Sequence, residues 1–388
     1  MREHADSDHL LARWENVDDD GSEDSLQMYL EHARFNHSFI KQSRATADIE
    51  YQSRIRFGER HDLTWGVGYR HHRDRIDGSF QINVGERRSS TSLYSVFVQD
   101  EITLQPERWR VIVGARLEHN DYTGYGFQPN ARLLWTPDAR NSLWMSAARA
   151  LRTPSRIERG GKIVVGMGDF GPDLPLVLRF DTPALDDERV DAIDVGWRHQ
   201  FNPATSVDLT LFHARHTRQR GAALEGEPPL VPPGYLLFAA VSNNDNYSNV
   251  SGLEVGVDWR ASRDWRLQAH YSWVRDEVGI GKAPGQVFSN YAGATPRHQF
   301  SLRSAVDLGP NLQWDTWLRY VSEVAVHSVP AYTTLDMRLA WKAQKNLTLA
   351  LVGQNLLDPV HPEYGNSFVL SRTAELERAV YLRADWAF

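Results

Sequence analysis

Apolar and polar residues alternate with a period of two along most of the chain from about residue 26 onward. Residues 62–71, 252–260 and 264–274 each show this alternation, and in the first of them Trp65 and Val67 share one face with their apolar neighbours. A period of two is typical of a β-strand that has one apolar and one polar face. The pattern therefore predicts an all-β fold.

The gaps between the predicted strands alternate between short and long. We expect sixteen strands, at residues 26–38, 45–57, 61–75, 92–104, 108–119, 126–136, 140–150, 188–201, 204–217, 236–260, 264–276, 297–307, 311–322, 332–342, 346–355 and 378–388. Short turns lie near residues 58–60, 105–107, 137–140, 202–203, 261–263, 309–310 and 343–345, and long loops at about 76–91, 151–187, 218–235, 277–296 and 356–377. Tight turns on one side and long loops on the other are typical of a membrane-spanning antiparallel, up-and-down β-barrel.

The acidic, turn-rich residues 1–25 are expected to form an N-terminal tail or loop remnant, and residues 26–388 the barrel. In hydrocarbon every backbone donor and acceptor needs a partner within the protein, which helices and closed barrels provide. The polar faces of the predicted strands are strongly charged, so they cannot form a dry core. The alternative is a soluble sheet with its apolar face buried and its charged face in water.

The composition removes several other classes of protein. With 41% hydrophobic residues and a mean hydropathy of -0.50, no stretch approaches the length of a membrane-spanning helix. A net charge of -7 without a basic block argues against a nucleic-acid-binding protein, and the absence of cysteine excludes disulfides and thiolate sites. The first residues lack the apolar core of a signal peptide, so we expect that the start of an exported gene product is missing.

The last predicted strand has its apolar residues on one face and ends on an aromatic residue. Val380, Leu382, Trp386 and Phe388 share this face. A terminal aromatic residue at the end of an alternating strand resembles the signal that the outer-membrane barrel-assembly machinery reads. The other interpretation is that a domain ends on a strand.

Several segments resemble TonB-dependent receptors, the ligand-gated transporters of the bacterial outer membrane. The resemblance rests on residues 94–104 followed by 109–119, on 128–137 followed by 142–158 with its Arg-Thr-Pro-Ser loop, on Asn249–Glu254, on Asn355–Gly365 and on the terminal strand. It covers about residues 26–388. The family's plug domain and TonB-contacting segment have no counterpart here, and sixteen strands fall short of the 22 in such barrels.

No catalytic or metal-binding pattern is present. The sequence has no G-x-S-x-G, H-E-x-x-H or phosphate-binding loop, and neighbouring histidines such as His71 and His72 face opposite sides of a strand. We therefore expect no enzyme activity, metal or cofactor. Aromatic and cationic side chains in the long loops suit an anionic or aromatic ligand. The candidate contacts are Arg152, Arg156, Tyr122, Tyr125 and Tyr235, although such residues also order loops and form the outer aromatic girdle.

The resemblance implies an outer-membrane receptor that takes up a large, scarce nutrient. Its ligand would most often be a ferric siderophore and sometimes cobalamin, its energy would come from the TonB complex through the missing plug, and its other partner would be outer-membrane lipid. Two alternatives stay open: a passive porin-like channel, and a soluble all-β carbohydrate-binding or hydrolytic domain.

Overall fold

The structure is a computed structural model that describes residues 3–169, 175–224, 226, 230–231, 234–281, 285–289, 293–365 and 375–387. Its main feature is one hydrogen-bonded sheet of 22 strands, and 17 of them form a continuous wall. The wall strands are β1 (His4–Val17), β2 (Glu23–Asn36), β3 (Lys41–Phe57), β4 (His61–Asp77), β6 (Arg88–Gln105), β7 (Trp109–Asn120), β8 (Gly124–Asp138), β9 (Asn141–Arg152), β12 (Glu188–Asn202), β13 (Thr205–Leu224), β15 (Tyr235–Arg260), β16 (Trp265–Gly279), β18 (His298–Gly309), β19 (Leu312–Val321), β20 (Tyr332–Gln344), β21 (Leu347–Gln354) and β24 (Ala379–Trp386). Each pairs antiparallel with its neighbours in the wall.

The sixteen predicted strands correspond in order to β2 through β24 of this wall. The prediction of a tail at residues 1–25 is wrong, because β1 pairs with β2 along its whole length, from His4 opposite Asn36 to Val17 opposite Glu23. The loop half of β1 is mostly polar, and an apolar alternation is limited to Leu10, Ala12 and Trp14. So short an alternating segment cannot be told from a polar tail in the sequence. With β1 the number of wall strands is seventeen instead of the predicted sixteen.

Short strands build up the loop side of the wall. They are β5 (Ile82–Asn83), β10 (Lys162–Asp169), β11 (Pro175–Asp181), β14 (Leu230–Val231) and β17 (Gln286–Ser289), with a separate pair β22 (Val360–Pro362) and β23 (Glu375–Glu377). β11 runs parallel to the first half of β15, from Leu176 opposite Leu236 to Asp181 opposite Val241. Two single turns of 3-10 helix, η1 (Arg156–Glu158) and η2 (Ala325–His327), also lie in loops.

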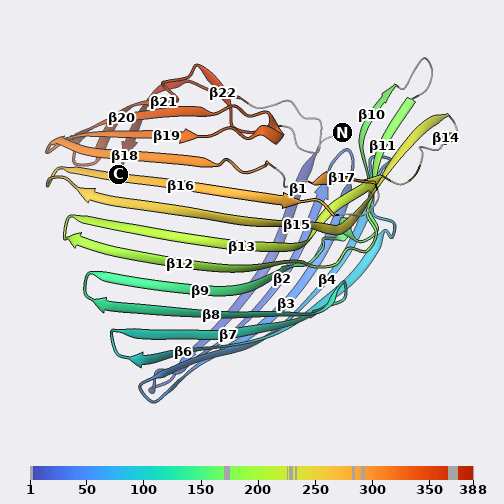
Figure 1. The fold of residues 1–388 in the computed structure, drawn as a ribbon, viewed down its shortest axis with the longest axis horizontal. Coiled ribbons are helices and arrows are strands. Elements are labelled where there is room, and N and C mark those ends of the chain that lie inside the picture. Colours follow the sequence, from blue (N-terminus) through green and yellow to red (C-terminus); the bar gives the residue numbers. More distant parts are fainter. Residues whose placement is uncertain are drawn as a thin grey trace.

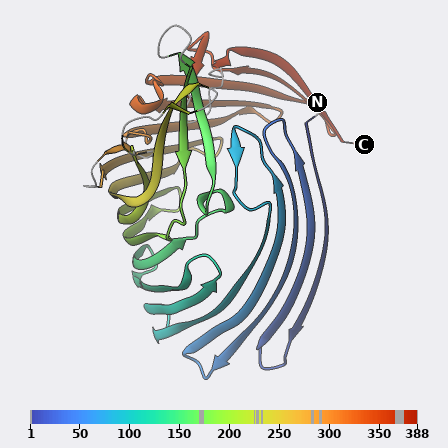
Figure 2. The same cartoon turned by 90° about the vertical axis from the view of Figure 1, so that its right-hand side faces the viewer.

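The wall curves around an open interior. Figure 1 shows the wall strands running between short turns at one end and the long loops at the other, where β10, β11 and β14 project beyond the wall. In Figure 2, which looks from the loop end, the green strands of the β9–β12 loop project toward the viewer and appear inside the outline of the wall. Within the described residues β1 pairs with β2 alone and β24 with β21 alone, so these two strands are the edges of the sheet.

The apolar face of the wall is exposed and is not covered by a second sheet. Trp259 and Trp265 are 45% and 40% exposed, whereas a soluble sandwich would seal them between two layers. Among the described residues, the cluster of buried hydrophobic side chains consists of Ala340, Ala350 and Val352. Within the described residues, the exposed apolar side chains of the outward face, which we call the belt, therefore pack against no protein core. No helix in the described part of the chain is both long and apolar enough to span a membrane.

Aromatic side chains border the belt at both ends. Trp109 stacks on Trp135 at 5.2 Å between ring centroids, beside the short turns. Toward the loops, His119 lies edge-on to Tyr125 with 4.6 Å between centroids. Trp135 and Tyr125 are ten residues apart on β8, about 33 Å along the strand. At a tilt of about 40° this is about 25 Å of height, which is the height of the apolar band of an outer-membrane barrel.

The concave face is polar, and its charges are paired across strands. The ion pairs Arg70–Asp48, Arg319–Asp336 and Arg338–Asp315 have N–O distances of 2.7, 2.9 and 2.9 Å. All of these side chains alternate with the belt residues along their strands. The charged side chains therefore lie on the concave face and the apolar side chains on the outward face, which is the division expected of a membrane-spanning barrel.

Leu209 on β13 lies within the belt, opposite Trp197 on β12 and Val255 on β15. Replacing it with arginine would place a charge in hydrocarbon, and we expect Leu209→Arg to destabilise the folded protein by about 2–4 kcal/mol. The matched control is Thr210→Arg, one residue along, which points to the polar face. Unfolding in urea, followed in lipid bilayers by the heat-shifted gel band of the folded form, measures both. Equal destabilisation by the two variants would contradict the assignment of the faces.

Candidate functional site at the mouth of the barrel

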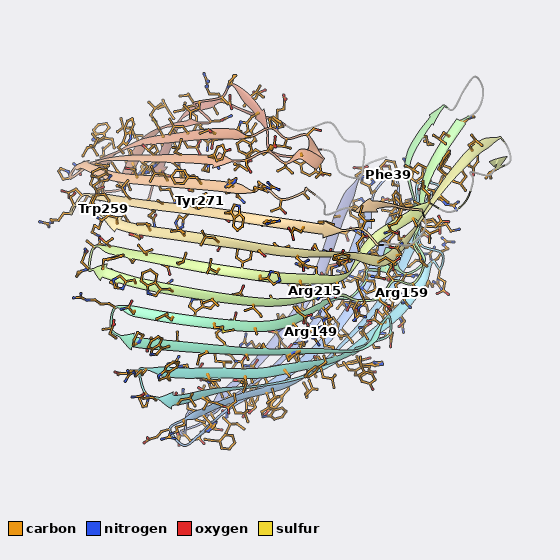
Figure 3. The ribbon with its side chains drawn as sticks, in the orientation of Figure 1. Phe39, Arg149, Arg159, Arg215, Trp259 and Tyr271 are labelled. Atoms are coloured by element: carbon orange, nitrogen blue, oxygen red, sulfur yellow. The ribbon has the colours of Figure 1, made fainter. Side chains whose placement is uncertain are left out.

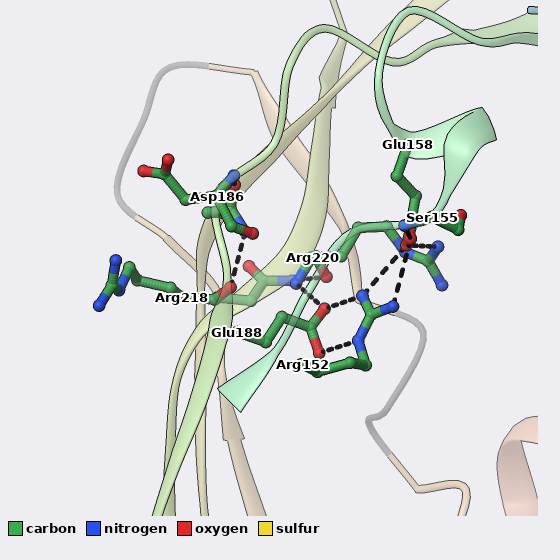
Figure 4. A network of polar contacts seen from close by, with 9 residues as sticks. Arg152, Ser155, Glu158, Asp186, Glu188, Arg218 and Arg220 are labelled. Carbon is green, nitrogen blue, oxygen red and sulfur yellow. Dashed lines mark hydrogen bonds and ion pairs between the residues drawn. The ribbon is translucent and has the colours of Figure 1, made fainter. Parts of the chain in front are cut away.

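The loop that follows β9 turns back over the polar face and is held there by an ion-pair cluster. We call Arg152, Ser155, Glu158, Glu188 and Arg220 the mouth cluster. Figure 4 shows them gathered from β9, η1, β12 and β13. Arg152 is the last residue of β9 and lies opposite Glu188, the first residue of β12. The end of β9 and the start of β12 therefore lie side by side at this point.

Glu158 is the centre of the mouth cluster and is 3% exposed. Its carboxylate accepts hydrogen bonds from Arg220 Nη1 at 2.6 Å, from the Ser155 amide at 2.7 Å and from Arg152 Nη2 at 3.0 Å. Burial by itself raises the pKa of the Glu158 carboxyl, but the bonds from Arg152 and Ser155 outweigh it and lower the pKa to about 2. Glu158 is therefore ionised at neutral pH and fully paired.

Arg152 has its guanidinium fully engaged by two carboxylates. Its Nε and Nη2 donate to the two oxygens of Glu188 at 2.9 and 2.8 Å, in addition to the bonds to Glu158. Two-point pairing of this kind is strong and geometrically specific. Arg152 therefore holds the loop to the wall. A ligand that bound the Arg152 guanidinium would have to displace one of these ion pairs.

A second attachment ties the same loop to the opposite part of the wall. Arg156 of η1 donates from Nε to Asp74 of β4 at 3.4 Å and from Nη2 to the carbonyl oxygen of Glu86 at 2.5 Å. The side chain of Arg156 is 15% exposed. In addition, β10 pairs with β5, with Ile163 opposite Ile82. The loop therefore spans the polar face from β12 to β4.

The three predicted tyrosines lie in different places. Tyr122 is in the turn between β7 and β8, and its ring receives the Arg159 guanidinium at 5.2 Å from the centroid. Tyr235 opens β15 and pairs with Val231 in the β14–β15 hairpin. Tyr125 is 77% exposed and belongs to the outward belt, away from the mouth. The loop side therefore brings Arg152, Arg156 and Tyr122 near η1, while Tyr125 faces the other way.

The carboxylate partners in the mouth were not predicted from the sequence. Glu158, Glu188 and Asp74 are separated in sequence from some of their arginine partners by 36 to 82 residues, and nothing local marks such a pairing. Within the part of the chain that the structure describes, no group of three or more His, Asp or Glu side chains is placed to hold a metal ion. The mouth is a polar surface of arginine, carboxylate and aromatic groups.

The sequence and the fold are similar to those of known proteins. The family described as "TonB dependent receptor-like, beta-barrel" matches residues 4–356. The chain belongs to the TonB-dependent receptor family. Family members are transporters of the bacterial outer membrane, not enzymes, so the location and the absence of an enzymatic function predicted from the sequence are confirmed.

Individual relatives of this receptor barrel are distant in sequence. The chain is 23% identical over 319 residues to the probable TonB-dependent receptor BfrD of Bordetella pertussis. This alignment covers 73% of the chain and 39% of BfrD. The siderophore receptor PirA of Acinetobacter baumannii superimposes with a TM-score of 0.73 at 14% identity, covering 99% of this chain and 62% of PirA. A ferric enterobactin receptor (PfeA) mutant from Pseudomonas aeruginosa gives 0.74 at 16% identity, with the same coverage. The chain thus spans less than two thirds of these relatives.

Glu158→Gln is expected to release the loop from the wall. Lowering the pKa from 4.5 to about 2 corresponds to on the order of 3 kcal/mol of stabilisation. Amide hydrogen exchange of residues 155–162 should therefore rise at least about tenfold in this variant at pH 7. Because the folded-state pKa is lowered, wild-type protection should persist above pH 4.5 and be lost as the pH falls toward 2.

The control for this experiment is Glu323→Gln, which removes an exposed carboxylate from the loop between β19 and β20. It should leave exchange in residues 155–162 unchanged. Retained protection in Glu158→Gln would show that the mouth cluster does not hold the loop.

Proposed function

We propose that this barrel is the uptake path of a TonB-dependent receptor for a ferric siderophore. The observation that carries the proposal is the loop fastened across the polar face by Glu158 and Arg156, since such a loop forms a binding surface above the interior. Two of the structural relatives are a siderophore receptor and a ferric enterobactin receptor by name. Another large, scarce solute, such as cobalamin, would suit the same architecture.

In this proposal the mouth residues have two different roles. Arg152 and Arg156 hold the loop, because their guanidinium groups are engaged by carboxylates. Tyr122 together with Arg159, and Tyr235 on its hairpin, would contact the ligand. Aromatic rings and a guanidinium suit the flat, anionic groups of an iron chelate through stacking and charge-assisted hydrogen bonds. The ligand then passes along the paired charges of the polar face.

The energy and the assembly of the receptor involve partners outside this chain. By family likeness the TonB complex would act through a plug domain, which is distinct from the barrel family matched by residues 4–356. We further propose that the terminal strand is the segment read by the barrel-assembly machinery. Val380, Leu382 and Trp386 lie exposed on β24, whereas Phe388 lies outside the described residues. Within the described residues β24 pairs along one edge alone, with β21, and an edge strand with an apolar face suits such recognition.

The alternative is a passive, porin-like channel with the same wall. A channel would conduct small ions continuously and would need no energy source. The loop across the mouth favours capture of a large ligand over free diffusion. The soluble carbohydrate-binding alternative conflicts with the exposed belt.

Uptake of radiolabelled ferric enterobactin tests the proposal. The protein, expressed from its own gene, is placed in hosts with and without a working TonB complex and without a ferric enterobactin receptor of their own. We expect saturable uptake that requires TonB. Tyr122→Ala should raise the KM about fivefold, because stacking of an aromatic ring on the ligand contributes about 1 kcal/mol. Tyr125→Ala, on the outward face, serves as the matched control and should leave the KM unchanged.

Uptake that is independent of TonB, together with steady ion conductance in planar bilayers, would replace the proposal with the porin-like alternative. TonB-dependent growth on cobalamin, without uptake of ferric enterobactin, would keep the receptor and change its ligand.

A further inference from the structure

Three arginines and one aspartate gather on the outward face where the belt ends. Asp191 on β12 lies directly opposite Arg149 on β9 and Arg215 on β13, and Arg189 is two residues nearer the loops on β12. We call these four residues the outward arginine cluster. Figure 3 shows Arg149 and Arg215 near one another toward the loop ends of the strands, with Trp259 at the opposite end, beside the short turns.

The outward arginine cluster carries more positive charge than its carboxylate can neutralise. Arg149 Nε donates to one oxygen of Asp191 and Arg189 Nε to the other, both at 2.7 Å. Among the described residues no carboxylate lies within ion-pair distance of Arg215, which is exposed. Three guanidinium groups against one carboxylate leave a net charge of about +2.

Neighbouring charges on the same face do not cancel this excess. Along the row that continues from Arg215, the next side chains are Asn249 on β15 and Glu277 on β16. Glu277 forms an ion pair with Arg275 on its own strand. The positive charge is therefore confined to β9, β12 and β13.

The outward arginine cluster lies at the level of the membrane surface on the loop side. On the short-turn side of the cluster, the same strands and face carry the apolar residues Met145, Ile193 and Leu211, which are 47%, 48% and 51% exposed. From Phe201 to Asp191 the outward face of β12 extends ten residues, the same interval as between the two aromatic ends of β8. Long arginine side chains can lie along apolar surface while the charged group reaches the headgroups.

We propose that the outward arginine cluster binds the phosphate groups of the glycolipid in the outer leaflet. The site joins an apolar surface for acyl chains to an excess of guanidinium groups at headgroup level, and guanidinium pairs with phosphate through two parallel hydrogen bonds. Asp191 holds Arg149 by its Nε atom and Arg189 by its Nε and Nη2 atoms. In each of them this leaves at least one terminal nitrogen to donate to phosphate. The site is independent of the mouth cluster, which lies on the concave face.

The test measures binding of purified lipopolysaccharide to the folded protein in detergent. The double variant Arg149→Gln/Arg215→Gln should bind about thirtyfold more weakly, since each arginine at an anionic membrane surface contributes about 1 kcal/mol, a factor of about five. The matched control is Arg198→Gln on β12, whose side chain points to the opposite face and pairs with Asp208. It should leave the affinity unchanged.

Two further measurements separate charge from folding and lipid from free anion. Arg149→Lys/Arg215→Lys keeps the charge and should restore most of the affinity, and the heat-shifted gel band reports folding of every variant. Dephosphorylated lipopolysaccharide should bind the wild type as weakly as the intact lipid binds the glutamine variant. Unchanged affinity in the folded glutamine variant, equal binding of dephosphorylated lipid, or displacement of the lipid by millimolar inorganic phosphate would each overturn the proposal.

Discussion

The structure depends on the requirement that a chain in hydrocarbon satisfy its own backbone hydrogen bonds. An antiparallel wall meets this requirement along its length, because each inner strand donates to and accepts from two neighbours. Once the wall exists, alternation of side chains separates the two environments. One face receives Leu209, Val255 and their apolar neighbours, and the other receives charges that pair across strands, such as Arg319 with Asp336. The absence of a packed core among the described residues follows from the same division.

Where side chains alternate regularly, the sequence alone was enough to predict the wall. All sixteen predicted strands are present in the predicted order, because each crosses the belt and therefore alternates. β1 was missed since much of it extends beyond the belt, where both faces meet water. The alternation of apolar and polar residues also does not predict where a large aromatic side chain fits on the polar face. Trp144 points to that face, and it fits because its partner across the strand pair is Gly196, where a Cβ atom would collide with the indole ring.

The mouth was predictable in its residue types but not in its contacts. Arginines and tyrosines in long loops pointed to a polar surface, and Arg152 and Arg156 do lie there. Their roles depend on carboxylates that the fold brings from distant segments, namely Glu158, Glu188 and Asp74. Sequence spacing carries no information on such pairs. The side on which a loop-end tyrosine lies is decided by strand parity, and one residue of difference places Tyr125 in the belt.

The direction of the two edge strands limits how the wall can become a cylinder. β1 starts at the loop side, β24 ends at the side of the short turns, and both descend the same way, as the positions of the two termini in Figure 1 show. Direct pairing of β1 with β24 would be parallel, in a wall whose other strands all pair antiparallel. An odd number of additional strands between them restores the alternating sense all the way round. Five such strands would bring the seventeen to the 22 of plugged outer-membrane transporters.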